Sequence, residues 1–109
     1  MKLMGQVRRL IEDLAAGRYA EIAADGRAGR LSEAELRTAV ARYGRTLVPL
    51  PADGEMLVDI YEQTSQPDAV SLDVPLWTRE EGRSDLTLSV TALKQGDTYT
   101  VEVDDLHVL

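Results

Sequence analysis

Three stretches in the second half of the chain decide its fold: residues 69–77 (AVSLDVPLW), residues 85–93 (DLTLSVTAL) and residues 98–108 (TYTVEVDDLHV). In each stretch apolar and polar residues alternate, so one set of side chains faces each side of an extended strand. Turn-forming residues separate the stretches. Residues 56–63 are a further strand candidate, and the whole pattern predicts a four-stranded antiparallel sheet.

Two features interrupt the alternation. Pro75 lies inside the strand predicted at residues 69–77. Because proline cannot donate a backbone hydrogen bond to a neighbouring strand, it indicates a bulge or an unpaired stretch. In the last strand the inward positions change from odd at Val103 to even at Leu106. One additional residue at Asp104 or Asp105 produces that change, which predicts a β-bulge and a bent sheet.

The first half of the chain has helical periodicity instead. Residues 2–16 carry apolar residues at spacings of three and four, and residues 19–24 suit a short second helix. Ser32 and Glu35 have the spacing of a capping box, so a third helix is expected to begin there. Residues 47–51 (LVPLP) contain two prolines and predict a hinge between the two halves.

These elements predict an α+β fold in a single domain, residues 1–109, with a helical half (1–50) and a sheet half (51–109). Two or three N-terminal helices are expected to pack on the curved four-stranded antiparallel sheet. A chain of 109 residues, of which 44% are hydrophobic, is long enough to bury a core without disulfides or metals.

The net charge of −7 is distributed unevenly along the chain. Residues 1–50 hold nine Lys or Arg and six Asp or Glu, a net +3, whereas residues 51–109 hold three and thirteen, a net −10. Such an acidic half repels free nucleic acid and attracts a basic protein. An acidic surface that only favours solubility is the alternative explanation.

Several kinds of site are not expected. The chain has no Cys, which excludes disulfides, thiolate metal sites and a cysteine nucleophile. It has no apolar run long enough to cross a membrane and no signal-peptide pattern at its start, so a cytoplasmic location without membrane contact is expected. No cofactor is predicted. Four carboxylates on neighbouring strands could gather and suit Mg²⁺ or Ca²⁺: Asp73, Glu102, Asp104 and Asp105. No calcium-loop spacing is present, so they are expected to be solvated and no metal site is predicted.

One segment combines the single tryptophan of the chain with a group of charged residues. Tryptophan and arginine are common in the energetically important centres of protein interfaces. The segment is therefore a candidate partner-binding site, with these residues: Trp77, Arg79, Glu80, Glu81, Arg83 and Asp85. The alternative is that the charged residues pair with one another and make the loop between two strands rigid.

The single histidine, His107, follows Asp105 at strand spacing, so both side chains are expected on one face of the sheet unless the bulge falls between them. A carboxylate beside an imidazole orients the ring and favours its protonated form, as in many general bases. The pair is a weak catalytic candidate, and a histidine with a structural role is the alternative. No motif ties a nucleophile to it.

Residues 74–88 (VPLWTREEGRSDLTL), 101–109 (VEVDDLHVL) and 43–49 (YGRTLVP) resemble a family of small bacterial proteins of uncharacterised function. The order of helices followed by a long-stranded sheet is also similar to the nuclear-transport-factor-2-like, or cystatin-like, fold. In that group helices pack into the concave face of a curved sheet, often around a cavity. The group includes isomerases, dehydratases and binding modules, so the resemblance implies a fold and no catalytic residue.

These observations favour a non-enzymatic binding module that contacts a basic protein through its acidic sheet half and the Trp77 segment, as an inhibitor, immunity-type or regulatory protein does. The alternative is a small-molecule-binding or enzymatic domain with a cavity between helices and sheet. Its polar lining would come from these residues: Asp105, His107, Tyr19, Tyr43, Tyr61 and Tyr99. A homodimer through the outer face of the sheet or the edge of its last strand is a third hypothesis.

Overall fold

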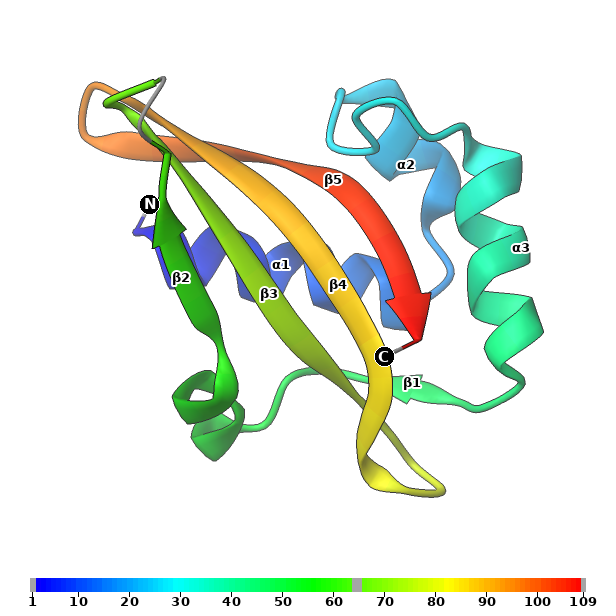
Figure 1. Ribbon diagram of the computed structural model, residues 1–109. Helices are drawn as coiled ribbons and strands as arrows, with labels where there is room; N and C mark the ends of the chain where they lie inside the picture. The colour runs from blue at the N-terminus through cyan, green and yellow to red at the C-terminus, as the bar shows by residue number, and fades with distance from the viewer. Residues whose placement is uncertain (1, 64–65, 109) are drawn as a thin grey trace.

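A curled antiparallel sheet follows three helices in the computed structural model, which describes residues 2–63 and 66–108 (Figure 1). The fold is α+β, as the sequence predicts. In chain order its elements are α1 (Leu3–Ala15), α2 (Tyr19–Ala24), α3 (Glu33–Tyr43), β1 (Leu47–Val48), the 3₁₀ helix η1 (Ala52–Leu57), β2 (Asp59–Glu62), β3 (Ala69–Thr78), β4 (Gly82–Gln95) and β5 (Thr98–Val108).

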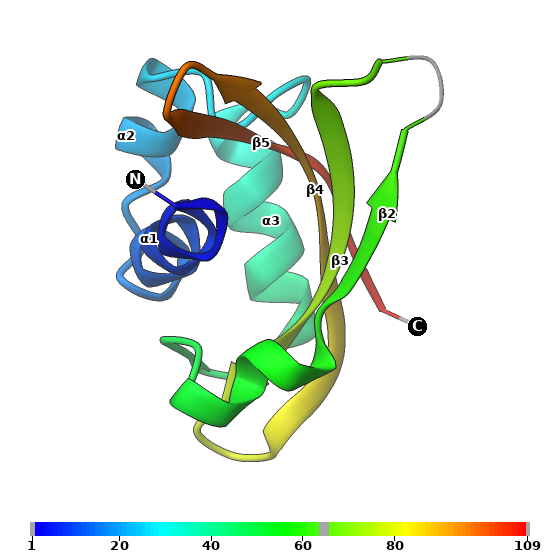
Figure 2. The ribbon, with the colours of Figure 1, turned by 90° about the vertical axis from the view of Figure 1, so that its left-hand side faces the viewer.

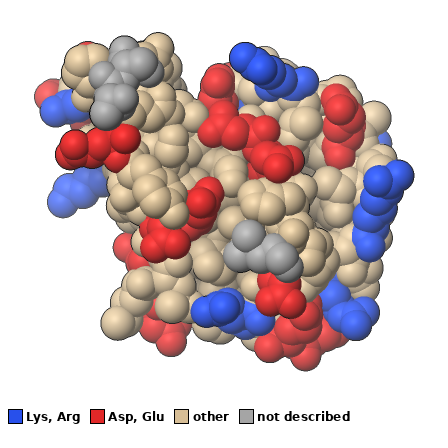
Figure 3. Space-filling view, in the orientation of Figure 1, with Lys and Arg blue, Asp and Glu red and all other residues tan. Residues whose placement is uncertain are grey.

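The strands lie in the order β1-β3-β4-β5, and β2 also pairs with β3. β1 and β2 therefore share one edge of the sheet, because β1 lies opposite the end of β3 and β2 lies opposite its beginning. The sheet curls into a half-barrel whose concave side faces the helices, with α1 inside the curve (Figure 2). The convex side, called the outer face here, is turned to the viewer in Figure 3.

The core forms where α1 meets the concave side of the sheet. The apolar stripe of α1 is fully buried, as the helical period predicts. The inward positions of β3 and β4, such as Leu72 opposite Val90 and Val74 opposite Leu88, are buried against it. Burying a side chain of this size stabilises the fold by about 1.5–3 kcal/mol before the entropy of ordering is subtracted.

Both predicted irregularities of the sheet are confirmed. The register between β3 and β4 shifts between Pro75 and Trp77. The register between β4 and β5 also shifts, because Ser89 lies opposite Asp105 while Val90 lies opposite Val103. The extra residue is Asp104. A bulge increases the local bend of a strand, which accounts for the curl of β5 around the helices (Figure 1).

Two predictions about residues 47–63 are wrong. The sheet of the described residues has five strands rather than four, because Leu47 and Val48 pair with β3 as β1 instead of forming only a hinge. Residues 56–63 are also not one strand, since η1 continues to Leu57 and β2 begins at Asp59. The prolines around Leu50 prevent β1 from extending, and the buried Leu47 and Leu50 hold this stretch against the core.

The helix α3 begins as the sequence predicts. Ser32 accepts a hydrogen bond from the Glu35 amide at 3.0 Å, and the Glu35 carboxylate accepts one from the Ser32 amide at 3.0 Å. This reciprocal pair satisfies two amides that lack partners at a helix start. The helix ends at Gly44, whose φ of 73° is left-handed.

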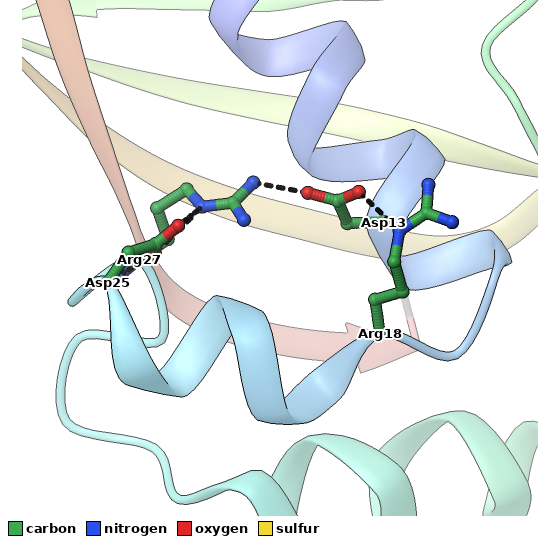
Figure 4. A network of polar contacts seen from close by, with 4 residues as sticks. All are labelled: Asp13, Arg18, Asp25 and Arg27. Carbon is green, nitrogen blue, oxygen red and sulfur yellow. Dashed lines mark hydrogen bonds and ion pairs between the residues drawn. The ribbon is translucent and has the colours of Figure 1, made fainter.

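Asp13, near the end of α1, is a buried carboxylate that the sequence analysis did not single out. It accepts hydrogen bonds from Arg18 at 2.8 Å and from Arg27 at 2.7 Å (Figure 4). Asp25 binds the other side of the Arg27 guanidinium at 2.8 Å. Burial alone would raise the pKa of Asp13, but the hydrogen bonds and charges of the two arginines outweigh it and lower the pKa. We call these four residues the Asp13–Arg27 junction.

The main chain of the junction also holds the last strand. The amide of Val103 in β5 donates to the Arg27 carbonyl at 2.7 Å. Two residues further on, Gly29 lies so close to β5 that an added Cβ would collide with the Val103 carbonyl oxygen. Its φ of 62° is left-handed as well. The loop after α2 therefore covers part of the β5 edge, next to the bulge.

Replacing Gly29 with alanine tests this contact. We expect Gly29→Ala to lower the free energy of unfolding in urea by about 2–3 kcal/mol, because it adds a steric collision with backbone to the strain of a left-handed alanine. Gly26→Ala is the matched control, since Gly26 has a φ of 85° but nothing within 4 Å of an added Cβ. Equal losses in the two variants would contradict the close approach to β5.

Replacing Asp13 with asparagine tests the ion pairs. We expect Asp13→Asn to cost about 2 kcal/mol at neutral pH, because two arginines lose their charged partner. The folded-state pKa of Asp13 is lowered, so the stability that the carboxylate adds is present at neutral pH and is lost as the pH falls below about 4. Urea unfolding at several pH values should show a shallower acid decline for Asp13→Asn than for the exposed control Glu12→Gln.

Candidate functional site

A row of polar side chains crosses the outer face of the sheet. Strand register places Asp59 of β2 opposite Asp73 of β3, Asp73 opposite Ser89 of β4, and Ser89 opposite Asp105 of β5. Side chains directly opposite one another in antiparallel strands lie on the same face. Three carboxylates from three strands therefore follow one line across the sheet, which we call the carboxylate row.

Further acidic residues lie beside this row. Glu102 lies opposite Thr91, and Thr91 donates a hydrogen bond from its hydroxyl to the Asp104 carboxylate at 2.6 Å. The bulge thus brings Asp104 and Asp105 to the same side of the sheet. Figure 3 shows Asp and Glu side chains spread over the middle of this face, with Lys and Arg toward its margin.

Two acidic residues of the outer face, Asp73 and Asp104, are held by hydroxyl groups rather than by basic side chains. Ser89 donates to Asp73 at 2.8 Å, as Thr91 does to Asp104. Among the described residues, no Lys or Arg forms an ion pair with Asp59, Asp73 or Asp104. The pKa of the Tyr61 hydroxyl is raised, first by the charge of Asp59 and then by partial desolvation and Asp73. A negative potential over this end of the face explains that direction.

The structure brings the two weak catalytic candidates together. His107 Nδ1 lies 3.1 Å from Asp105 Oδ2, an ion-pair distance when the ring is protonated, although no hydrogen bond with good geometry joins them. The His107 side chain is 36% exposed. Thr87, directly opposite His107, has a buried hydroxyl without a hydrogen-bond partner among the described residues. Neither Asp105 nor His107 faces the core between helices and sheet, and a catalytic role for them stays a prediction.

The Trp77 segment forms the hairpin between β3 and β4. Glu80 accepts hydrogen bonds from the amide and the hydroxyl of Thr46, both at 2.8 Å. Glu81 accepts from the hydroxyls of Thr78 and Tyr43, both at 3.0 Å. The amide of Thr46, followed by its hydroxyl, lowers the pKa of Glu80. Both glutamates therefore tie the hairpin to the chain that follows α3.

The other residues of the segment have different surroundings. Trp77 is half-buried against the core, and an added Cβ on Gly54 would lie 3.1 Å from its indole nitrogen. Arg79, Arg83 and Asp85 are exposed. No ion pair within the segment occurs among the described residues, so the charged residues are not rigidified by pairing with one another. Partner binding by this segment stays a prediction.

Grooves lie at the rim of the helix–sheet interface. One of about 340 Å³ runs between α3 and β5, where Glu35, Arg42 and Asp105 contribute to its lining. A neighbouring groove of about 310 Å³ shares Arg42 and reaches His107. The four tyrosines do not line a common cavity. Tyr43 belongs to the hairpin contact, and Tyr61 is half exposed on β2.

Residues 2–63 and 66–108 contain no group of three or more His, Cys, Asp or Glu side chains placed to hold a metal ion. None of the helices in this part of the chain is long and apolar enough to span a bilayer.

Comparison with known proteins identifies the family. Residues 11–109 match the family model of a domain of unknown function, DUF7668, and the chain belongs to that family. This agrees with the predicted resemblance to an uncharacterised family. Neither the curated proteins nor the solved structures contain a match to the chain.

The sequence analysis found the acidic half but not the carboxylate row. Alternation alone places Asp73 and Asp105 on the outer face, whereas bringing them into one line needs the register between strands and the length of the bulge. Asp59 lies within the predicted strand 56–63 but was missed, because its pairing with Asp73 depends on contacts between separate strands. Side chains alternate between the two faces along residues 59–62. Together with the pairing of β2 beside Ser71 and Asp73, this alternation places Asp59 on the outer face.

Replacing Tyr43 with phenylalanine tests the anchoring of the hairpin. The Tyr43 hydroxyl donates to Glu81 and accepts from the Asp85 amide at 3.3 Å. We expect Tyr43→Phe to cost about 1 kcal/mol and to speed hydrogen exchange of the Asp85 amide, while the amides of β5 remain unchanged. Tyr19→Phe is the control, and an unchanged Asp85 exchange rate in Tyr43→Phe would contradict the anchoring contact.

Proposed function

We propose that this protein is a non-enzymatic binding module that contacts a basic protein through the acidic outer face of its sheet and the adjoining Trp77 hairpin. The observation that carries the proposal is the carboxylate row, Asp59, Asp73 and Asp105, on a face where Asp104 and Glu102 add further charge. Uncompensated carboxylates on one face attract a positively charged partner over a distance of about one Debye length, roughly 8–10 Å.

The packing of the rest of the molecule supports this choice over an interior cavity. The interface between helices and sheet is filled by aliphatic side chains that are almost fully buried. The outer face, in contrast, is covered by no helix (Figure 2). A rigid sheet that presents charged groups in fixed register provides complementary positioning for basic side chains, and such complementarity speeds association and selects partners.

A carboxylate that is already held in one rotamer loses little conformational entropy when a partner binds. Asp73 and Asp104 already accept hydrogen bonds from Ser89 and Thr91, so their rotamers are restricted before a partner arrives. Binding then loses less side-chain entropy than it would with free carboxylates. The hydroxyl donors also leave the charge intact, because a neutral donor does not cancel it as a lysine or arginine would.

A second candidate function is small-molecule binding by a nuclear-transport-factor-2-like domain. The groove of about 340 Å³ between α3 and β5, with Asp105 and Arg42 in its lining, favours it. This groove lies at the rim of the sheet rather than on its concave side. The family resemblance that motivates this candidate concerns the arrangement of helices and sheet alone.

The test of the binding module uses a purified partner. Proteins captured from a native lysate are identified, and the most basic one is purified and measured against this protein at two salt concentrations. We expect the double variant Asp73→Asn/Asp105→Asn to reduce the association rate constant by about tenfold at low salt, and less at high salt. The asparagines keep the size of the side chains.

The matched control changes two exposed carboxylates on the helices, Glu12→Gln/Glu21→Gln. It removes the same net charge from a different face. Equal effects of the two double variants would show that only net charge matters and would overturn the outer face as the binding site. Saturable binding of a small molecule in the α3–β5 groove, with no basic partner in any sample, would favour the second candidate.

A further inference from the structure

We infer that β2 is a docking strand, to which an extended basic segment of the partner protein adds as a new strand of the sheet. This inference rests on the proposed function and names the binding mode. β2 lies at the edge of the sheet and, within residues 2–63 and 66–108, pairs only with β3. All four of its residues, Asp59–Glu62, are exposed.

The backbone of β2 is arranged for strand addition. The Gln63 amide donates to the Ala69 carbonyl at 3.4 Å, in the same register that pairs Tyr61 with Ser71. Antiparallel pairs alternate between bonded and non-bonded positions. The amide and carbonyl groups of Ile60 and Glu62 therefore point to the open side, where the described chain provides no neighbouring strand. Unpaired edge groups of this kind are the template for strand addition.

Apolar side chains flank this edge on both sides. Ile60 is 53% exposed although it lies opposite the buried Leu72, on the face of the sheet that elsewhere packs against α1. Tyr61, on the outer face, is 50% exposed, and Met56, in the 3₁₀ helix η1 before β2, is 85% exposed. An added strand would cover Ile60 with one of its faces and Tyr61 with the other. Burial of such side chains supplies affinity that hydrogen bonds at an edge alone lack.

The charges around β2 favour a basic segment as the strand that binds at this edge. Residues 46–78 contain six Asp or Glu and no Lys or Arg. Of these carboxylates, Glu55 is paired with Arg8, which donates a hydrogen bond to it at 2.6 Å. Three others form no ion pair in the described chain: Asp59, Glu62 and Asp73. A second copy of β2 would bring two more carboxylates, Asp59 and Glu62, and no Lys or Arg to this edge, so its approach is opposed by like charge. A segment with alternating basic residues meets the carboxylates instead.

The other edge of the sheet does not offer the same site. The amide of Val103 in β5 is already bonded to the Arg27 carbonyl, and Gly29 packs on the same stretch. The groove farther along β5 is lined by both signs of charge, Glu35 and Asp105 against Arg42. Its chemistry therefore selects no particular occupant, and β2 is the edge where charge and open backbone coincide.

The test uses a synthetic peptide of about eight alternating lysine and valine residues, slightly longer than an average strand. A second peptide has the same lysines but proline in place of two central valines, so it keeps its charge and cannot pair along an edge. We expect the first peptide to bind at least about tenfold more tightly, which corresponds to the loss of one to two hydrogen bonds in the second. Its binding should also slow hydrogen exchange of the Ile60 and Glu62 amides.

A pair of variants tests the same contact from the side of the protein. Ile60→Pro removes an amide that points away from β3, so the pairing of β2 with β3 keeps its hydrogen bonds, whereas Ile60→Thr retains the amide and loses similar apolar area. We expect Ile60→Pro to weaken the lysine–valine peptide about tenfold relative to Ile60→Thr. If Ile60→Pro alters the β3 amide spectrum, the comparison of the two peptides on the wild-type protein decides alone.

The outcomes separate this inference from the proposed function. Equal binding of the two peptides without protection of Ile60 and Glu62, but with sensitivity to Asp73→Asn/Asp105→Asn, would overturn strand addition and leave the acidic face as the binding site. An identified basic partner that binds wild type and Ile60→Pro alike would do the same. If neither peptide binds and no basic partner is found, both proposals are wrong.

Discussion

The contact between the Arg27 loop and β5 determines how the two halves of this molecule fit together. The guanidinium of Arg27 lies between Asp13 and Asp25, and its carbonyl accepts the Val103 amide. One residue thus joins the end of α1, the loop after α2 and the last strand. Its charge is partly buried with two opposite charges beside it, which offsets part of the cost of desolvation. The pKa of Asp25 is lowered by the hydrogen bond from Arg27, as expected for a carboxylate held in that arrangement.

This contact also makes the two edges of the sheet unequal. At β5 the loop uses the Val103 amide, and the bulge at Asp104 bends the strand toward the helices. At the opposite edge, β1 and the chain around Leu50 cover the end of β3, and Arg8 fixes that chain by donating to the Leu50 carbonyl at 2.6 Å. In the described part of the chain β2 pairs with β3 alone, so its other side is free. Proteins commonly protect such an edge by keeping the strand short and charged, and the four residues of β2 include two carboxylates.

The sequence predicted the parts of this fold that follow from local patterns. The capping box at Ser32 and the bulge at Asp104 were found because each leaves a mark within a few residues. Contacts between distant segments leave no such mark, so the pairing of Asp13 with Arg27 could not be read from two polar residues on separate elements. The strand β1 was missed for a related reason. Two residues before a proline carry too little periodicity to predict a strand, and their partners, Trp77 and Thr78, lie about thirty residues further along the chain.

The negative charge of the outer face and the open edge of β2 are physically related. An exposed edge strand with Ile60 and Tyr61 would favour self-association if it were uncharged. The carboxylates of Asp59 and Glu62 oppose the approach of an identical strand and lower the barrier to a basic one, so the same charges act against one partner and in favour of another. Hydroxyl donors such as Ser89 hold the neighbouring carboxylates in place without neutralising them. A basic side chain in their position would neutralise these carboxylates. Residues 46–78 contain no Lys or Arg, and the proposed binding mode depends on that absence.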